Sequence, residues 1–308
     1  MNRIEKIKGF SNWENVEKID VGFDNCEKYS FVESNKKYVL KIFDEENNEK
    51  KKREINILNK LKDTDLLIPK VISYDKVDDW YYYILSWIQG ETIKSLKQEL
   101  DDSILYEIGE KVGSMMATIH KVCTYDVDLS GNVNKILSRL KIYEQYQFNM
   151  KNEDKVIDFI RKNIDDLKKQ PITMIHGDLT EDNIILKDGK IGLIDFGSAN
   201  INYAYYDFHQ VQMYNRFFSI PFSAAIIDSY LKQTSVNDYF FKILKIYSAY
   251  LSLYKIVWAK KMNRMDLVEE MMNRYLTTYD DYKGFEIDVP TWYTDFDRKK
   301  VKSLKNNK

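Results

Sequence analysis

The first third of the chain alternates apolar and polar residues over short segments, which is the pattern of β-strands. Runs rich in β-branched and aromatic residues predict strands at 16–23, 27–34, 37–43, 70–75 and 80–88. The first three runs predict an antiparallel meander, with an Asn-Lys-Lys turn at 35–37. One helix is expected over 47–62, where Glu54, Leu58 and Leu61 share a stripe. We therefore predict a small sheet with one helix, ending near residue 88.

Beyond Gly90 the apolar positions recur every three or four residues, which is typical of amphipathic helices. Helices are predicted at 104–120, 133–146, 155–168 and 208–276, and short strands follow Pro171. The pattern predicts an α+β fold of two lobes, a β-rich N-terminal lobe over 1–88 and a mainly helical C-terminal lobe over 89–296. The basic tail at 297–308 has few apolar residues, and we expect it to be frayed.

Composition excludes several classes of function. The 308 residues are 44% hydrophobic and 31% charged, and the net charge of -1 offers no general attraction to nucleic acid or to an anionic membrane. The two cysteines are too few and too far apart for a disulfide framework or a recognisable metal site. Neither a signal-peptide core nor an apolar run of membrane-spanning length is evident. We expect a cytoplasmic, monomeric protein.

The segment NIILKDGKIGLIDFG predicts a tight hairpin. Asp188-Gly189 between two apolar runs favours a two-residue type I′ turn, which needs positive φ at both positions. Counting back from the turn, Asn183 lies opposite Ile194, so Asn183 and Asp195 are expected at the same open end. Asp178 lies five residues before Asn183, on the loop that leads into this end. Two carboxylates and an amide should therefore converge.

Converging oxygen ligands of this kind suit Mg²⁺, which usually takes one or two carboxylates together with phosphates and water. Asp178 would then be free to contact a substrate hydroxyl and accept its proton, as phosphoryl transfer requires. The alternative is that His176, Asp178 and Asn183 are only turn and cap residues beside a structural hairpin, since these residue types are common in turns.

The motif His176-Gly177-Asp178-Leu179, together with Asn183 and the run 194–197 (IDFG), resembles the catalytic and metal-binding motifs of the aminoglycoside phosphotransferase family. That family has the protein-kinase-like fold. The resemblance implies that Asp178 is the catalytic aspartate, that Asn183 and Asp195 hold Mg²⁺, and that ATP or GTP donates the phosphate. It extends, more thinly, over about 16–276.

A lysine and a glutamate occupy unusual positions in the N-terminal lobe. Lys41 alternates with Val39 and Phe43, which places its ammonium on an apolar strand face, where burial without a partner would cost several kcal/mol. Glu54 lies on the apolar stripe of the following helix and is the natural partner, with Glu49 as the rival. By resemblance Lys41 and Glu54 form the ion pair that positions the nucleotide phosphates. The alternative is an edge lysine and a solvated glutamate.

Two further nucleotide contacts are implied by the resemblance. The run YYYILSWIQGE resembles the interlobe hinge, so backbone groups near Ser86 and Ile88 would meet the adenine edge, although a plain buried strand is the alternative. The expected phosphate-covering loop has a single glycine, Gly22, and an acidic residue, Asp24, which would be repelled by a triphosphate unless it points outward.

His120 and Asp207 are expected to have structural rather than catalytic roles. His120 ends a predicted helix, so we expect it to interact with the last carbonyl groups, where a partly cationic imidazole is favoured. Asp207, two residues before His209, is interpreted as an N-terminal helix cap rather than a catalyst.

The segment after Asp195 leads directly into helix, with no long activation segment and no Ala-Pro-Glu motif, so a small-molecule acceptor is favoured over a protein. The tyrosines and tryptophans of the helical lobe suit stacking against ligand rings. Several acids of this lobe could pair with the amines of a cationic antibiotic, namely Asp228, Asp238, Glu269, Glu270, Asp280 and Asp281. We expect most of them to lie on solvated helix faces instead.

Three functions remain open. The first is an antibiotic resistance enzyme, an O-phosphotransferase with an aminoglycoside as the expected acceptor. The second is a metabolic kinase of the same fold that acts on choline, homoserine or a sugar. The third is a catalytically idle relative that serves as a binding or coat component. Intact Lys41, Asp178, Asn183 and Asp195 argue against the third.

Overall fold

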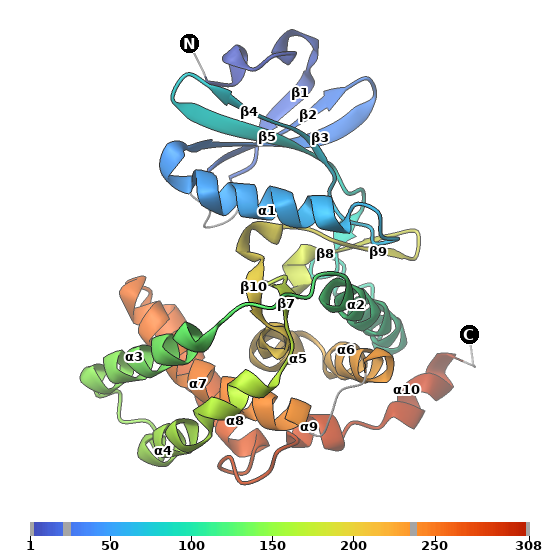
Figure 1. The fold of residues 1–308 in the computed structure, drawn as a ribbon. Helices are drawn as coiled ribbons and strands as arrows, with labels where there is room; N and C mark the ends of the chain where they lie inside the picture. Colours follow the sequence, from blue (N-terminus) through green and yellow to red (C-terminus); the bar gives the residue numbers. More distant parts are fainter. Residues whose placement is uncertain (1–2, 21–25, 235–238, 306–308) are drawn as a thin grey trace. The chain divides into compact units, whose positions relative to one another are not determined.

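The computed structural model describes residues 3–20, 26–234 and 239–305, and its chain divides into two compact units. The first unit contains Met1–Ser95 and Asp182–Asn200, and the second contains Leu96–Glu181 and Ile201–Lys308. The first unit is rich in antiparallel sheet and the second is mainly helical (Figure 1), as the sequence predicts.

The main sheet of the first unit is antiparallel, in the order β1-β2-β3-β5-β4. Its strands are β1 (Glu14–Lys18), β2 (Glu27–Glu33), β3 (Lys36–Asp44), β4 (Val71–Val77) and β5 (Trp80–Ser86). The turn between β2 and β3 is formed by Ser34 and Asn35, both with positive φ, because Glu33 pairs with Lys36. The predicted turn at 35–37 was therefore one residue late. Residues 21–23 of the first predicted strand lie outside the described residues.

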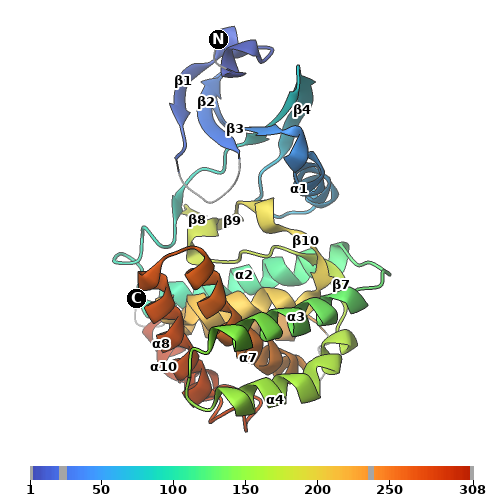
Figure 2. The ribbon, with the colours of Figure 1, turned by 90° about the vertical axis from the view of Figure 1, so that its left-hand side faces the viewer.

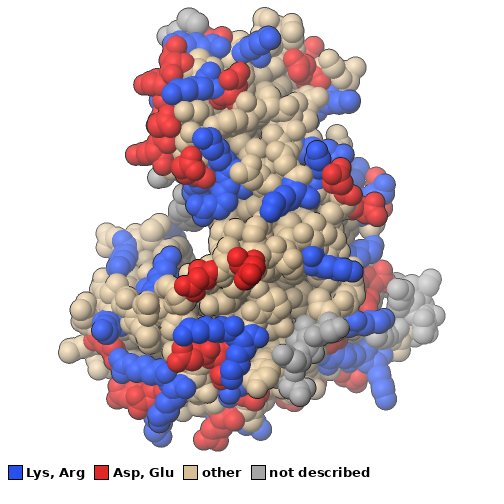
Figure 3. All heavy atoms as spheres, in the orientation of Figure 1, with Lys and Arg blue, Asp and Glu red and all other residues tan. Residues whose placement is uncertain are grey.

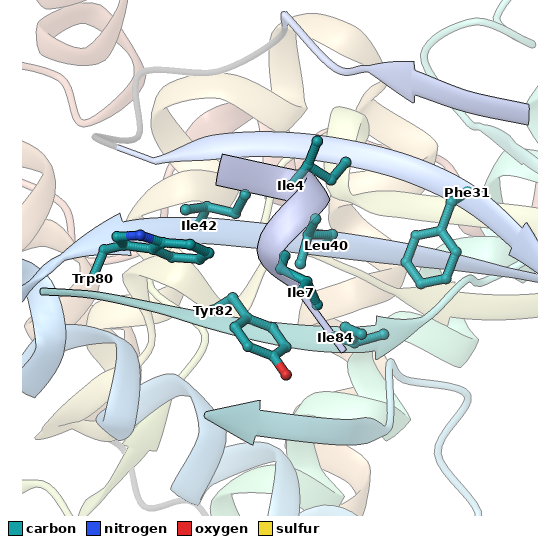
Figure 4. Close-up of a cluster of buried hydrophobic side chains, with 8 residues drawn as sticks. All are labelled: Ile4, Ile7, Phe31, Leu40, Ile42, Trp80, Tyr82 and Ile84. Atoms are coloured by element: carbon teal, nitrogen blue, oxygen red, sulfur yellow. The ribbon is translucent and has the colours of Figure 1, made fainter. Parts of the chain in front are cut away.

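Alternation along β3 gives the sheet two different faces. Leu40 and Ile42 are at most 1% exposed and belong to an apolar cluster with Ile4 and Ile7, which lie in and just after the short helix η1 (Arg3–Lys6) (Figure 4). Lys41, on the opposite face, meets the helix α1 (Asn48–Leu61). As predicted, the stripe of α1 that carries Glu54 is buried. The sheet is thus covered on both faces.

A smaller sheet in the first unit contains β6 (Glu91–Thr92), β8 (Ile184–Lys187) and β9 (Lys190–Leu193), in the order β6-β8-β9. Asp188 and Gly189 have φ of 49° and 70°, as a type I′ turn requires. The pairing of β8 with β9 runs from Lys187 opposite Lys190 to Ile184 opposite Leu193. This confirms the predicted register.

The second unit is built from helices and one two-stranded sheet (Figure 2). Gly109 and Gly113, one turn apart on α2, face the backbone of α6, where an added Cβ would lie 2.3 Å from a carbonyl oxygen. Glycine therefore allows α2 and α6 to approach closely. The longer helices are α2 (Asp102–Val122), α3 (Ser130–Tyr146), α4 (Glu153–Asn163), α6 (Ile220–Gln233), α7 (Tyr239–Lys261), α8 (Met265–Asp281) and α10 (Arg298–Lys305).

The remaining elements of the chain are short. Those of the second unit are η4 (Ile164–Lys169), β7 (Ile172–Ile175), η7 (Ala204–Phe208), the π-helix η8 (Val211–Asn215), α5 (Arg216–Phe218) and α9 (Thr291–Thr294). The strand β10 (Asn200–Tyr203) pairs with β7. Those next to β-strands of the first unit are η2 (Phe10–Asn12), η3 (Glu45–Asn47), η5 (Glu181–Asn183) and η6 (Phe196–Ser198).

Residues Arg298–Lys305 of the tail that we expected to be frayed form the helix α10. Arg298 binds Asp228 with two nitrogens, at 2.7 and 3.0 Å, and Val301 is 6% exposed against Tyr106. The contacts of Arg298 and Val301 thus attach α10 to the rest of the second unit. Lysines and arginines are interspersed with acids on the face seen in Figure 3. None of the described helices is both long and apolar enough to cross a membrane.

Candidate active site

The hairpin carries Asn183 and Asp195 at its open end, as predicted. The backbone N–H of Ile194 donates to the Asn183 carbonyl at 3.0 Å, so Asp195 follows directly on a residue paired with Asn183. Asp195 has a left-handed backbone with φ of 57°, and its Oδ1 accepts a hydrogen bond from the N–H of Gly197. The amide and the carboxylate therefore leave the ladder at the same place.

Lys41 and Glu54 form the predicted buried ion pair. The Lys41 Nζ lies 2.9 Å from Glu54 Oε1, and the Tyr83 hydroxyl donates to Glu54 Oε2 at 2.7 Å. Burial lowers the pKa of Lys41, but Tyr83, Glu54 and Asp195 outweigh it, so the pKa is raised well above its usual value. The rival Glu49 is exposed and pairs with Lys52. Lys41 therefore stays charged.

Asp195 lies between two ammonium groups. Its Oδ1 is 3.6 Å from Lys41 Nζ, and its Oδ2 is 3.7 Å from Lys28 Nζ. Lys28 stands directly opposite Lys41 in the β2–β3 register, so both side chains lie on the same face of the sheet. Sequence reasoning missed Lys28, although the strand register would have placed it beside Lys41.

The donor set fits a magnesium ion that is shared with a substrate. Within the described ranges no group of three or more His, Cys, Asp or Glu side chains could enclose a metal by itself. Asn183 and Asp195 offer two oxygen ligands, which matches Mg²⁺ because it takes few protein ligands and completes its octahedron with phosphate and water. The two ammonium groups next to Asp195 show that this carboxylate attracts positive charge.

Asp178 belongs to the second unit, where its loop is held by a glutamine. Gln210 Nε2 lies 3.3 Å from Asp178 Oδ1 and 3.4 Å from the Gly177 carbonyl. The N–H of Asp178 donates to His176 Nδ1 at 3.3 Å. These contacts orient the carboxylate and leave Asp178 only half-buried. The convergence of Asp178 with Asn183 and Asp195 stays a prediction.

Asp207 anchors the loop that carries Asp178, and its interpretation as a helix cap was wrong. It is fully buried, its Oδ2 accepts from the N–H of His176 at 2.8 Å, and its Oδ1 accepts from the N–H of Gly177 at 2.7 Å. His120 Nε2 lies 3.2 Å from Asp207 Oδ2, and His120 Nδ1 lies 2.9 Å from the Tyr230 hydroxyl. His120 therefore binds Asp207 rather than the last carbonyls of its helix.

The charge of Asp207 is stabilised by these contacts. Burial raises the pKa of the Asp207 carboxyl, but the hydrogen bond and charge of His120 and the hydrogen bond from Gly177 outweigh it, so the pKa is lowered. Sequence reasoning could not find this anchor because its partners lie 31 and 87 residues away.

Two buried oxygens beside the loop lack a donor. Asn215 donates to the Leu179 carbonyl at 3.0 Å, but Asn215 Oδ1 and Gln210 Oε1 have no hydrogen-bond partner among the described residues. Buried acceptors of this kind are normally satisfied. A substrate hydroxyl or a water molecule could supply the missing donor.

Ser86 and Ile88 are the two residues predicted to contact the adenine edge. The N–H of Ser86 donates to the Lys70 carbonyl at 2.9 Å and is therefore not free for an adenine edge. The Ser86 Oγ accepts a hydrogen bond from the N–H of Lys70 at 2.8 Å. Ile88 is 9% exposed. A role of either residue in nucleotide binding stays a prediction, and Gly22 and Asp24 lie outside the described residues.

Most acids proposed to bind a cationic acceptor are already paired within the chain. Asp228 binds Arg298 at 2.7 Å and Asp281 binds Arg216 at 2.7 Å, while Glu270 pairs with Arg274 and Asp280 lies 3.9 Å from Lys151. Glu269 is exposed on α8, and Asp238 lies outside the described residues.

Comparison with known proteins agrees with this architecture. The sequence profile described as the phosphotransferase enzyme family (APH) matches residues 15–241. No curated protein sequence is significantly similar to the chain.

Solved structures of aminoglycoside kinases share the fold at low identity. A thermostable mutant of aminoglycoside phosphotransferase APH(4)-Ia, in complex with ADP and hygromycin B, is 16% identical with a TM-score of 0.63, over 90% of this chain and 96% of that one. The gentamicin complex of APH(2″)-IIa is 18% identical with a TM-score of 0.59, over 86% and 91%. Spectinomycin phosphotransferase APH(9)-Ia, with ADP and spectinomycin, is 14% identical with a TM-score of 0.58, over 86% and 93%.

Proposed function

Because the chain belongs to the phosphotransferase enzyme family, we propose that it is a small-molecule kinase that transfers the terminal phosphate of ATP or GTP to a hydroxyl group. The observation that carries the proposal is the charged cluster of the first unit, in which Lys28 and Lys41 flank Asp195 and Glu54 holds Lys41. Such a cluster presents two cations and a metal-binding carboxylate to a triphosphate.

In the proposed reaction the acceptor hydroxyl oxygen forms a bond to the γ-phosphorus, and the bond from that phosphorus to the β–γ bridging oxygen breaks. The nucleoside diphosphate leaves, and the hydroxyl proton passes to the Asp178 carboxylate. Lys41, fixed by Glu54, pairs with the phosphates. Mg²⁺ held by Asn183 and Asp195 would neutralise charge on the transferred group. Asp207 keeps the loop of Asp178 in place through His176 and Gly177.

An aminoglycoside is the first acceptor to test, because the matching structures are complexes with hygromycin B, gentamicin and spectinomycin. Sequence identities of 14–18% support a shared fold only. The identity of the acceptor must therefore be inferred from the residues of this chain. Choline, homoserine and sugars are the acceptors of the alternative, a metabolic kinase.

A nucleoside-diphosphate release assay tests the proposal. Purified protein is supplied with Mg²⁺ and ATP or GTP, and with aminoglycosides, choline, homoserine or monosaccharides in turn. We expect Mg²⁺-dependent thermal stabilisation by the nucleotide, and diphosphate release that requires one acceptor class. A protein that binds no nucleotide would instead support the idle binding or coat relative.

A further inference from the structure

Aromatic rings and cations gather on one part of the second unit. We define the cationic aromatic cluster as Arg139, Tyr206, Tyr214, Tyr254 and Lys255. The Arg139 guanidinium lies over the Tyr254 ring at 4.6 Å, and Lys255 Nζ lies over the Tyr214 ring at 5.3 Å. Burial raises the pKa of Tyr206, on which the charges of Arg139, Asp207, Tyr214 and Tyr254 also act. The five side chains are therefore neighbours, although they come from α3, η7, η8 and α7.

The cluster is attached to the segment that holds the catalytic loop. Tyr206 directly precedes Asp207, which binds the backbone of His176 and Gly177. Gln210, which donates to Asp178, lies four residues before Tyr214, about one helical turn away. A molecule bound at the cluster would thus lie beside the loop that carries the proposed base.

The two cations of the cluster have no carboxylate partner in the part of the chain that the structure describes. Arg139 donates to the Tyr250 hydroxyl at 3.0 Å and stacks on Tyr254, and Lys255 stacks on Tyr214 and Trp258. Both side chains are half-buried. Removing part of the water around a charge without an opposite charge is unfavourable, so an anion bound here would be stabilised by both groups.

The carboxylates near the cluster do not outnumber its cations. Asp207 is occupied by His120 and the catalytic loop, and Glu270 is paired with Arg274, which itself stacks on Tyr214 at 4.7 Å. His209, close to Lys255, is neutral near pH 7 because burial and Lys255 lower its pKa to about 4. The cluster therefore carries net positive charge.

We propose that the cationic aromatic cluster binds the acceptor, and that this acceptor is a hydroxyl compound with a ring and a negatively charged group, not a polycation. Arginine and lysine bind carboxylate or phosphate, and the half-buried tyrosines offer ring faces and hydroxyls to a planar group. The same two cations repel a polyamine, which gives selectivity against aminoglycosides. The inference rests on the proposed kinase function and specifies its substrate class.

Two matched probes test the charge preference. 3-Phenyllactate and phenylalaninol each carry a benzyl group and a hydroxyl, but the first has a carboxylate and the second an ammonium. Their binding is measured by calorimetry with magnesium AMP-PNP bound, next to gentamicin as a polycation. We expect 3-phenyllactate to bind at least about tenfold more tightly than phenylalaninol, as one charge-assisted contact allows.

Substitutions locate the site. Arg139→Met and Lys255→Met should each weaken 3-phenyllactate about tenfold without changing the affinity for magnesium AMP-PNP. Lys260→Met, which removes an exposed lysine from the same helix as Lys255, is the matched control and should leave both affinities unchanged. Melting temperatures confirm that each variant is folded.

The outcomes separate the two proposals. Protein that fails to bind magnesium AMP-PNP contradicts the kinase function itself. Protein that binds the nucleotide but prefers phenylalaninol or gentamicin, shows no saturable binding of 3-phenyllactate, or keeps full affinity in Arg139→Met and Lys255→Met, overturns only the anionic acceptor.

Discussion

Lys28 Nζ lies 3.7 Å from Asp195 Oδ2, and Lys41 Nζ lies 3.6 Å from the other oxygen of the same carboxylate. Lys41 also has Glu54 as a partner, whereas Lys28 has Asp195 alone among the described carboxylates. When Asp195 turns to a metal ion, Lys28 would become available to phosphate oxygens. Lys28 can therefore supply positive charge to a bound triphosphate.

Lys28→Met should weaken ATP binding about tenfold and leave adenosine binding unchanged, because only the triphosphate carries the charge that Lys28 meets. Lys36→Met removes an exposed lysine of the adjacent strand and serves as the control. Titration of each ligand by calorimetry gives the two affinities. Equal losses for ATP and adenosine would point to a folding defect rather than a phosphate contact.

Asp178→Ala should lower turnover by roughly 10²- to 10⁴-fold with little change in nucleotide affinity, because the carboxylate acts on the acceptor proton. Initial rates of diphosphate release, measured at saturating nucleotide and acceptor, give the effect on kcat. Full phosphotransfer by this variant would show that another group accepts the proton.

Asp207→Asn should lower both stability and turnover. The buried carboxylate accepts from two backbone N–H groups and from His120, so its loss should cost about 2–4 kcal/mol of unfolding free energy. Loosening the loop of Asp178 should reduce kcat by roughly 10- to 100-fold. Chemical denaturation and initial rates give the two quantities.

Asp228→Asn is the control for Asp207→Asn. Asp228 is likewise a hydrogen-bonded carboxylate of the second unit, but it binds Arg298 of α10 instead of the loop that carries Asp178. We expect a loss of stability with unchanged kcat. If Asp207→Asn and Asp228→Asn lowered kcat equally, the effect of Asp207→Asn on kcat would result from a general loss of stability.

Acidification should destabilise the protein through His209. Burial, and then the charge of Lys255, lower its folded pKa to about 4, below the usual 6.5. The unfolded chain therefore binds a proton between pH 6.5 and 4 that the folded chain does not, so this contribution to stability is complete above pH 6.5 and is lost as the pH falls towards 4. At pH 5 the loss is about 2 kcal/mol.

His209→Gln removes this titration and keeps a hydrogen-bond donor for the Tyr206 carbonyl. The difference in unfolding free energy between pH 7.5 and pH 5, measured by urea denaturation, should be about 2 kcal/mol smaller in the variant than in the parent. An identical difference in the two proteins would rule out His209 as the source.

Features fixed by local sequence were predictable. The Asp188-Gly189 turn sets the hairpin register, because the backbone of the turn determines which residues face each other. Lys41 and Glu54 could be paired because each occupies an apolar face where a lone charge is unfavourable. The first inference needed only the turn type, and the second needed only periodicity and the cost of burying a charge.

Features that depend on long-range packing were not predictable. Asp207 has an ordinary sequence context, and only the folded chain brings His120 and the loop of His176 to it. Lys28 lies opposite Lys41 only in the observed β2–β3 register, and the predicted turn was one residue late, so the sequence analysis did not bring the two lysines together. The position of Asp178 relative to Asn183 and Asp195 stays a prediction.

Deleting the first eight residues would remove Ile4 and Ile7 and expose the apolar side of β3 to water. Leu40 and Ile42 would then form an exposed hydrophobic patch, so the shortened protein should aggregate during purification. The deletion should also disturb the proposed phosphate site, because Lys41 lies between Leu40 and Ile42 in sequence and points to the opposite face of the strand. An affinity tag should therefore be added ahead of this segment through a flexible linker, and never in its place.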